Sequence, residues 1–136
     1  MYQYKVTVTK VVDGDTVDVD IDLGFAVVLK KQRVRRYEID TPESRTRDLE
    51  EKKFGLASKE YLKNKLENAT NIYLTSHDKG KFGRILGELF IDDIEKSVNM
   101  QLVDNHHAVY YYGQNKNDVN QEHLVNIEWL TKNKKI

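Results

Sequence analysis

Three carboxylates and an arginine gather around the only proline of the chain. Arg35 precedes the segment Asp40-Thr41-Pro42-Glu43, and Asp15 lies further upstream within Val12-Asp13-Gly14-Asp15-Thr16. Carboxylates that must meet at one point usually hold a hard cation or move protons. An arginine beside them usually binds a phosphate or another carboxylate. Together these residue types predict a metal-dependent phosphodiesterase site.

Each acidic residue also has a plain structural interpretation. Asp15 follows a glycine, and Asp-Gly pairs are common in turns. It shares the alternation of Val17 and Val19, however, so we expect it on the inward side at the mouth of a barrel. Asp40 and Glu43 could be an incidental acidic pair in a turn that Pro42 helps to hold, because proline fixes one backbone dihedral angle. The sequence leaves open whether Glu43 is a base or a ligand.

A second acidic run, Asp18, Asp20 and Asp22, alternates with apolar residues. An EF-hand loop requires glycine at its sixth position and glutamate at its twelfth. Counted from Asp18, these positions hold Leu23 and Leu29. The run is therefore predicted to be the solvated face of a strand.

Basic side chains flank an aromatic ring in the segment Lys79-Gly80-Lys81-Phe82-Gly83-Arg84. This pattern suits nucleic-acid binding, and the alternative is a solvated hairpin. The tyrosines at 110–112 are expected to divide between core packing and an exposed ring. His106 and His107 are interpreted as loop or helix-end residues, because adjacent side chains rarely share a ligand direction, and His123 as a packing residue in a helix.

The composition predicts a single domain over residues 1–136. A hydrophobic content of 39% and a charged content of 32% are ordinary for a soluble globular protein. The 22 basic and 22 acidic residues give a formal net charge of +0, which argues against a general basic binder of nucleic acid. The absence of cysteine excludes disulfides, thiolate catalysis and cysteine-bound zinc. No apolar run suggests a signal peptide or a membrane span, so we expect a cytoplasmic protein with no membrane partner, or a secreted one if a leader has been removed.

Hydrophobic periodicity predicts the elements that must position these residues. Alternation around Tyr4–Thr9 and Val17–Ile21 is typical of half-buried strands. Further strands are expected at Ala26–Leu29, Gln32–Ile39, Asn71–Ser76 and Ile85–Phe90, with a turn or bulge at Lys30-Lys31. Helices are expected over Glu50–Leu66, after an N-cap at Ser97, and over Val119–Asn133, where Leu124, Ile127, Trp129 and Leu130 are available for the core. This order predicts an α+β fold around a curled antiparallel sheet. A small Greek-key barrel of the OB type fits the spacing, although the pattern alone does not single it out.

Taken in order and spacing, these motifs resemble the staphylococcal (micrococcal) nuclease family, also called thermonucleases. Arg35 lies five residues before Asp40, which is the spacing of the family. Phe54-Gly55 resembles part of its first helix, and Lys81-Phe82-Gly83-Arg84 resembles its lysine-aromatic-glycine-arginine turn. Ser97-Val98-Asn99 resembles its second helix, and the resemblance runs from about Val6 to His123.

The resemblance implies a five-stranded OB-fold Greek-key β-barrel with about three helices and a calcium-dependent nuclease site. Family members cut DNA and RNA and leave the phosphate on the 3′ side. By position in the motifs, the calcium ligands would be Asp15, Asp40 and the carbonyl of Thr41; the catalytic residues would be Arg35, Glu43 and Arg84; and the nucleotide pocket would be lined by Lys81, Phe82 and Tyr112. We expect a monomer that prefers single strands, because a duplex hides the base faces.

Two departures from the family pattern concern substrate contacts. Phe82 stands where a tyrosine is usual, which removes a hydroxyl, and Gln114 stands where a second spaced tyrosine is expected. Two alternative functions would use only part of this residue set. An OB-fold module that binds nucleic acid or protein without cutting would not need the complete acidic and arginine set. A structural calcium-binding domain would not need Arg35, Lys81 or Arg84 near the acids.

Overall fold

A closed barrel of five strands, in the order β1-β2-β3-β6-β5, forms the centre of the computed structural model, which describes residues 2–79, 84–92 and 94–133. Its neighbouring strands are antiparallel, except that β3 runs parallel to β6. The barrel strands are β1 (Tyr2–Asp13), β2 (Thr16–Asp22), β3 (Val28–Arg36), β5 (Ile72–Lys79) and β6 (Ile85–Ile91). A separate two-stranded ribbon pairs β4 (Ile39–Asp40) with β7 (Val109–Tyr110). The expected five-stranded α+β barrel is confirmed.

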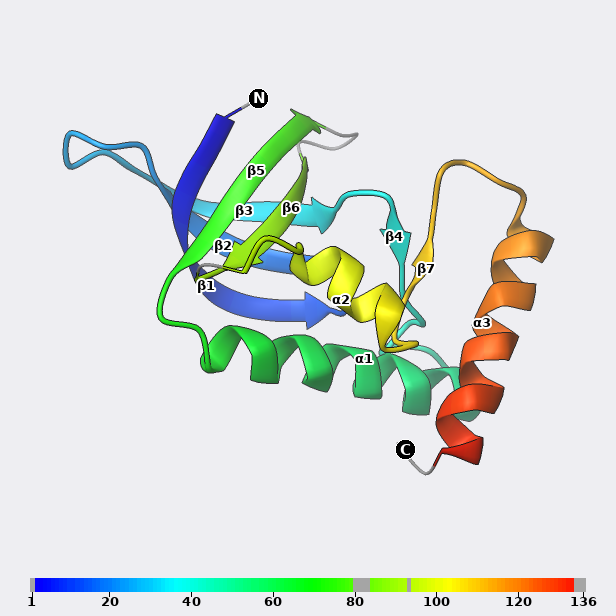
Figure 1. Cartoon of the computed structure of the whole chain (residues 1–136). Coiled ribbons are helices and arrows are strands. Elements are labelled where there is room, and N and C mark those ends of the chain that lie inside the picture. The colour runs from blue at the N-terminus through cyan, green and yellow to red at the C-terminus, as the bar shows by residue number, and fades with distance from the viewer. Residues whose placement is uncertain (1, 80–83, 93, 134–136) are drawn as a thin grey trace.

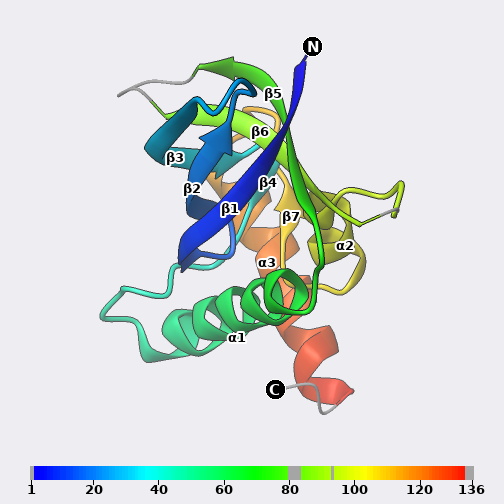
Figure 2. The ribbon, with the colours of Figure 1, turned by 90° about the vertical axis from the view of Figure 1, so that its left-hand side faces the viewer.

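Three helices are present in the described part of the chain, namely α1 (Leu49–Glu67), α2 (Val98–Asp104) and α3 (Lys116–Lys132). Helix α1 runs beneath the barrel, and α2 lies between α1 and strand β6 (Figure 1). The β4–β7 ribbon and α3 stand at one end of the molecule, away from the β2–β3 hairpin (Figure 1). The view turned by 90° shows the five barrel strands above α1 (Figure 2). None of these helices is long and apolar enough to cross a membrane.

The alternating residues of β2 divide between the core and the surface as predicted. Val17, Val19 and Ile21 are buried in the barrel. On the outer face, the Asp18 carboxylate forms an ion pair of 2.8 Å with Arg33. The expected solvated face is therefore confirmed for this strand. The turn or bulge expected at Lys30-Lys31 is a bulge, because the register with β2 shifts by one residue between Gln32 and Leu29.

Helix ends follow the capping side chains. Asp48 accepts hydrogen bonds from the first turn of α1, and Ser97 caps α2 as predicted. Helix α3 begins at Lys116, earlier than expected, because Asn115 accepts a hydrogen bond of 2.9 Å from the backbone of the first turn. The expected core contribution of α3 is only partly correct. Its buried residues are Val119 and Leu130, whereas Leu124 and Trp129 are exposed.

A buried arginine holds the barrel to α2. The side chain of Arg36 is almost fully buried, and its Nε donates a 2.5 Å hydrogen bond to Oδ1 of Asn99. Asn99 in turn donates a 3.0 Å hydrogen bond to the backbone carbonyl of Tyr37. Burial lowers the pKa of Arg36 to about 9, so the guanidinium keeps its charge at neutral pH. A buried charge of this kind depends on its hydrogen-bond partners.

We predict that Asn99→Ala destabilises the fold. The change removes the acceptor of a buried charged group, and such losses lower the free energy of unfolding by about 3 kcal/mol. Chemical denaturation followed by circular dichroism measures the change. The exposed Asn120→Ala variant is the control and should differ from the parent by less than about 0.5 kcal/mol. Equal stability of the two variants would contradict a structural role for the Arg36–Asn99 contact.

Candidate active site

Arg35 joins the two aspartates that the sequence singled out. Its Nη1 lies 3.2 Å from Oδ2 of Asp15, and its Nη2 lies 3.5 Å from Oδ1 of Asp40. Nη1 also donates a 2.9 Å hydrogen bond to the backbone carbonyl of Ile39, next to Asp40. Asp15 is the second residue of the β1–β2 turn, Arg35 lies near the end of β3, and Asp40 ends β4. The fold therefore brings these three residues together from three segments.

Asp15 is the most enclosed carboxylate of this group. It is 7% exposed and accepts hydrogen bonds from the Thr16 hydroxyl (3.0 Å) and from the backbone N–H of Thr41 (3.3 Å). Burial raises the pKa of Asp15 above its usual range, and the negative charge of Asp40 adds to this rise. Arg35 and the two hydrogen bonds lower the pKa and oppose the rise. The expected inward position at the barrel mouth is confirmed.

Glu43 stands at the exposed edge of the same acidic group. Partial burial raises the pKa of its carboxyl group, and the neighbouring negative charges of Asp13, Asp15, Asp40 and Glu51 raise it further. Two consequences follow from this surplus of negative charge. Glu43 holds a proton more readily than an isolated glutamate does, and the site favours a bound cation.

Close packing against α1 fixes the backbone that carries Glu43. A Cβ atom at Gly55 would lie 2.2 Å from the carbonyl oxygen of Glu43 and 2.6 Å from the amide nitrogen of Ser44. On the other side of this segment, the Asp13 carboxylate accepts hydrogen bonds from both the backbone N–H (3.2 Å) and the hydroxyl of Ser44. The Glu43–Ser44 backbone is thus held between α1 and the end of β1. The sequence reasoning did not assign this role to Asp13.

The structure also places His123 at the site, although the sequence reasoning assigned it to packing. Its Nε2 lies 2.8 Å from Oδ2 of Asp40, so this carboxylate sits between an imidazole and the Arg35 guanidinium. Helix α3 is held nearby by a 3.1 Å hydrogen bond from the Asn126 side chain to the Ala108 carbonyl. His123 is 83 residues from Asp40 in the sequence. No local motif could have revealed this contact.

Arg84 lies next to the strand that pairs with the end of β3. It immediately precedes β6, whose Leu86 is paired with Arg35. Leu86 therefore shares the face of Arg35, and by continuation of the strand alternation we expect Arg84, two residues before it, on that face as well. Within the ranges that the structure describes, Arg84 forms no ion pair with a carboxylate, so its guanidinium is not committed to the acidic group. The predicted pocket residues Lys81 and Phe82 lie outside the described residues.

The tyrosine segment runs beside the acidic cluster. Tyr110 pairs with Ile39 across the β4–β7 ribbon, and the backbone N–H of Tyr111 donates a 2.7 Å hydrogen bond to the Glu38 carbonyl. The exposed fractions of Tyr110, Tyr111 and Tyr112 are 46%, 44% and 75%. The expectation that this segment would divide between the core and the surface is therefore wrong, because all three rings are exposed.

The oxygen atoms at this site suit a hard cation. They include the Asp15 and Asp40 carboxylates and the Thr41 carbonyl, and carboxylate and carbonyl oxygens are the usual ligands of Ca²⁺. The buried Thr41 hydroxyl also has no hydrogen-bond partner among the described residues. Within those residues, no three acidic or histidine side chains already surround a single point, and Arg35 contacts both aspartates. The chemistry of the oxygen donors and their surplus negative charge fit a cation.

Comparison with known proteins identifies relatives of this chain. A sequence model of the family described as staphylococcal nuclease homologue matches residues 33–136. A curated relative, endonuclease YhcR of Bacillus subtilis (strain 168), is 31% identical over 117 residues. The alignment covers 81% of this chain but only 9% of the relative, so the chain corresponds to a small part of that larger protein.

We predict that Gly55→Ala destabilises the protein and displaces the Glu43 segment. Alanine is the better helix former by about 1 kcal/mol, so without a clash the change would stabilise α1. The new methyl group would meet the Glu43 carbonyl, and overpacking of this kind costs about 1–3 kcal/mol. Chemical denaturation gives the free energy of unfolding, and the NMR shifts of the Glu43 and Ser44 amides report the displacement.

The exposed Leu56→Ala variant is the matched control in the same helix. It should leave the Glu43 and Ser44 amide shifts unchanged. A stabilised Gly55→Ala protein with unchanged shifts would show that the helix does not fix this backbone.

Proposed function

We propose that this chain, which belongs to the staphylococcal nuclease family, is a nuclease that hydrolyses phosphodiester bonds. Its catalytic site would be formed by Asp15, Arg35, Asp40, Glu43 and Arg84. We propose further that it cuts both DNA and RNA, depends on calcium, and acts as a single domain over residues 1–136. The observation that carries the proposal is the Arg35 guanidinium, which contacts two aspartates beside the exposed Glu43. This arrangement combines cation ligands, a proton acceptor and a phosphate-binding group.

Calcium would be held by Asp15, Asp40 and the carbonyl of Thr41. When bound, the ion would supply Lewis-acid polarisation of the phosphodiester and offset its negative charge. The Asp15 carboxylate is kept in place for this role by its hydrogen bonds from Thr16 and Thr41. His123 would orient Asp40 in the same way, since hydrogen-bond partners of ligand carboxylates fix their direction.

Glu43 would position the attacking water and accept its proton. The raised pKa of its carboxyl group makes it a better proton acceptor than an isolated glutamate. The water oxygen forms a bond to phosphorus, the bond from phosphorus to the 5′ oxygen breaks, and the phosphate stays on the 3′ side. Arg35 and Arg84 would stabilise the negative charge that builds on the phosphate in the transition state. Their planar forks suit two phosphate oxygens better than lysine would.

The substrate would contact an aromatic platform beside the site. We propose Tyr112 and Phe82 for this platform, with Lys81 next to it. Support comes from Tyr112, whose ring is 75% exposed in the segment that follows β7. Stacking tolerates any base and requires an accessible base face, so single strands are the proposed substrate. We also propose that the protein acts as a monomer.

The proposal predicts that Glu43→Gln lowers turnover far more than it weakens binding. A positioned base typically contributes about 10²–10⁴-fold to the rate. Cleavage of single-stranded DNA and of RNA is measured with calcium and with chelator, and binding is measured separately. We expect the parent protein to be active only with calcium.

The exposed Glu95→Gln variant carries the same charge change away from the site and should keep the turnover of the parent. Near-normal turnover of Glu43→Gln would show that Glu43 has no catalytic role and is only part of a turn. Equal cleavage by the parent in chelator would contradict the metal assignment.

A further inference from the structure

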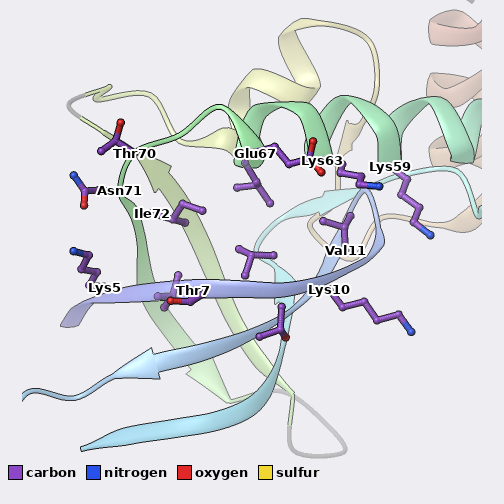
Figure 3. Close-up of a pocket in the computed structure, with 14 residues that line it drawn as sticks. Lys5, Thr7, Lys10, Val11, Lys59, Lys63, Glu67, Thr70, Asn71 and Ile72 are labelled. Atoms are coloured by element: carbon purple, nitrogen blue, oxygen red, sulfur yellow. The ribbon is translucent and has the colours of Figure 1, made fainter. Parts of the chain in front are cut away.

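A groove separates β1 from the second half of α1. It has a volume of about 590 Å³, and Thr70, Asn71 and Ile72 line one end of it (Figure 3). Strand β5 pairs with β1 only as far as Val6. Beyond Val6, this edge of β1 faces α1 instead of another strand among the described residues. The groove is therefore a built feature of the barrel, formed where one strand leaves its neighbour.

Positive charge is concentrated along this groove. Four lysines line it, two from β1 and two from α1, against one glutamate: Lys5, Lys10, Lys59, Lys63 and Glu67. None of the four lysines forms an ion pair with a described residue. The whole chain has a formal net charge of +0, so this is a local excess. Asp18 lies opposite Lys10 and interacts with its charge, but its carboxylate is ion-paired with Arg33. The groove therefore keeps an excess of positive charge, which is complementary to a polyanion.

Two of these lysines destabilise the helix by their mutual repulsion. Lys59 and Lys63 are one turn apart on α1, and like charges at this spacing destabilise a helix by about 0.2–0.5 kcal/mol. Figure 3 shows Lys10 on β1 at the same end of the groove as this pair. Lys59 and Lys63 form no ion pair with a described residue, and Lys10 interacts at longer range with the charge of Asp18, which lies opposite it on β2. A bound anion would relieve the repulsion between the lysines.

This end of the groove adjoins the turn that leads into the acidic site. Lys10 lies on β1 shortly before the two-residue turn that Gly14 and Asp15 form. On the helix, Ser58 precedes Lys59, and its Cβ lies 3.0 Å from where a Cβ of Gly14 would be. Lys10 and Asp15 therefore belong to the same hairpin, and Lys59 follows the α1 residue that packs against its turn.

We propose that this groove binds the phosphate backbone of a single-stranded nucleic acid whose scissile phosphate lies at the acidic site. The inference rests on the proposed function and adds a second contact region to it. Lysines act on phosphates as point charges and do not select a base. The lining contains no aromatic residue, so it offers no stacking platform and favours backbone contacts independent of sequence. The groove would hold the strand, while chemistry occurs beyond its Lys10 end.

The test compares long and short substrates of a triple variant, Lys10→Gln, Lys59→Gln and Lys63→Gln. An oligonucleotide of about 16 nucleotides is long enough to reach the groove from the site. Its affinity should fall about tenfold or more, and the slope of log affinity against log salt should decrease by about 2, because each lost phosphate contact removes about 0.7 for single strands. A dinucleotide occupies only the catalytic site, so its kcat/KM should stay unchanged.

The control is Lys116→Gln with Lys132→Gln, two exposed lysines of α3 away from the groove. This variant should bind the long oligonucleotide as the parent does. If the triple variant binds the long oligonucleotide with the affinity and salt dependence of the parent, the groove proposal is overturned. An acidic peptide or protein would then be the remaining candidate ligand of the groove. An equal loss for the dinucleotide would also overturn it, because the lysines would then act at the site itself. A parent protein that cleaves neither substrate would instead refute the proposed function.

Discussion

The candidate site holds several negatively charged carboxylates close together. Asp15 and Asp40 come from separate segments and would repel each other, and Asp13, Glu43 and Glu51 add further negative charge nearby. Arg35 contacts both aspartates and offsets part of this repulsion. Burial, and after it the neighbouring carboxylates, raise the pKa of both Asp15 and Glu43, and Arg35 offsets only part of the rise at Asp15. In the proposed function, this negative charge attracts a cation, and Arg35 and Arg84 bind the anionic substrate.

Rigid parts of the fold keep this unfavourable cluster in place. The β1–β2 turn approaches α1 closely at Gly14, and the segment after Asp40 is held between Gly55 and the Asp13 carboxylate. The buried Arg36 connects β3, which also carries Arg35, to α2. Helix α3 buries only Val119 and Leu130 and reaches the site through the His123–Asp40 contact. Packing in the barrel and against α1 thus offsets the unfavourable free energy of the repulsion between these carboxylates.

The sequence predicted those features that depend on local patterns. Alternation identified β2 and its solvated aspartates, and capping residues identified the start of α2. Spacing singled out Arg35 and Asp40, which lie together in the fold. Contacts between distant segments were not predictable, and His123 was therefore taken for a packing residue. The exposed Leu124 and the tyrosines at 110–112 show the same limit, since hydrophobic character alone does not say which face of an element is covered.

The most direct measurement is a calorimetric titration of Ca²⁺ into the metal-free protein and into a variant carrying Asp15→Asn and Asp40→Asn. Asparagine keeps the size of each side chain and removes its charge, and circular dichroism verifies that the variant is folded. The account predicts about one ion bound per parent chain, with a dissociation constant of about 10⁻³ M or tighter, and no such binding by the variant. Equal binding by both proteins, or none by a parent that cleaves nucleic acid in chelator, would contradict the claim that these aspartates form a cation site.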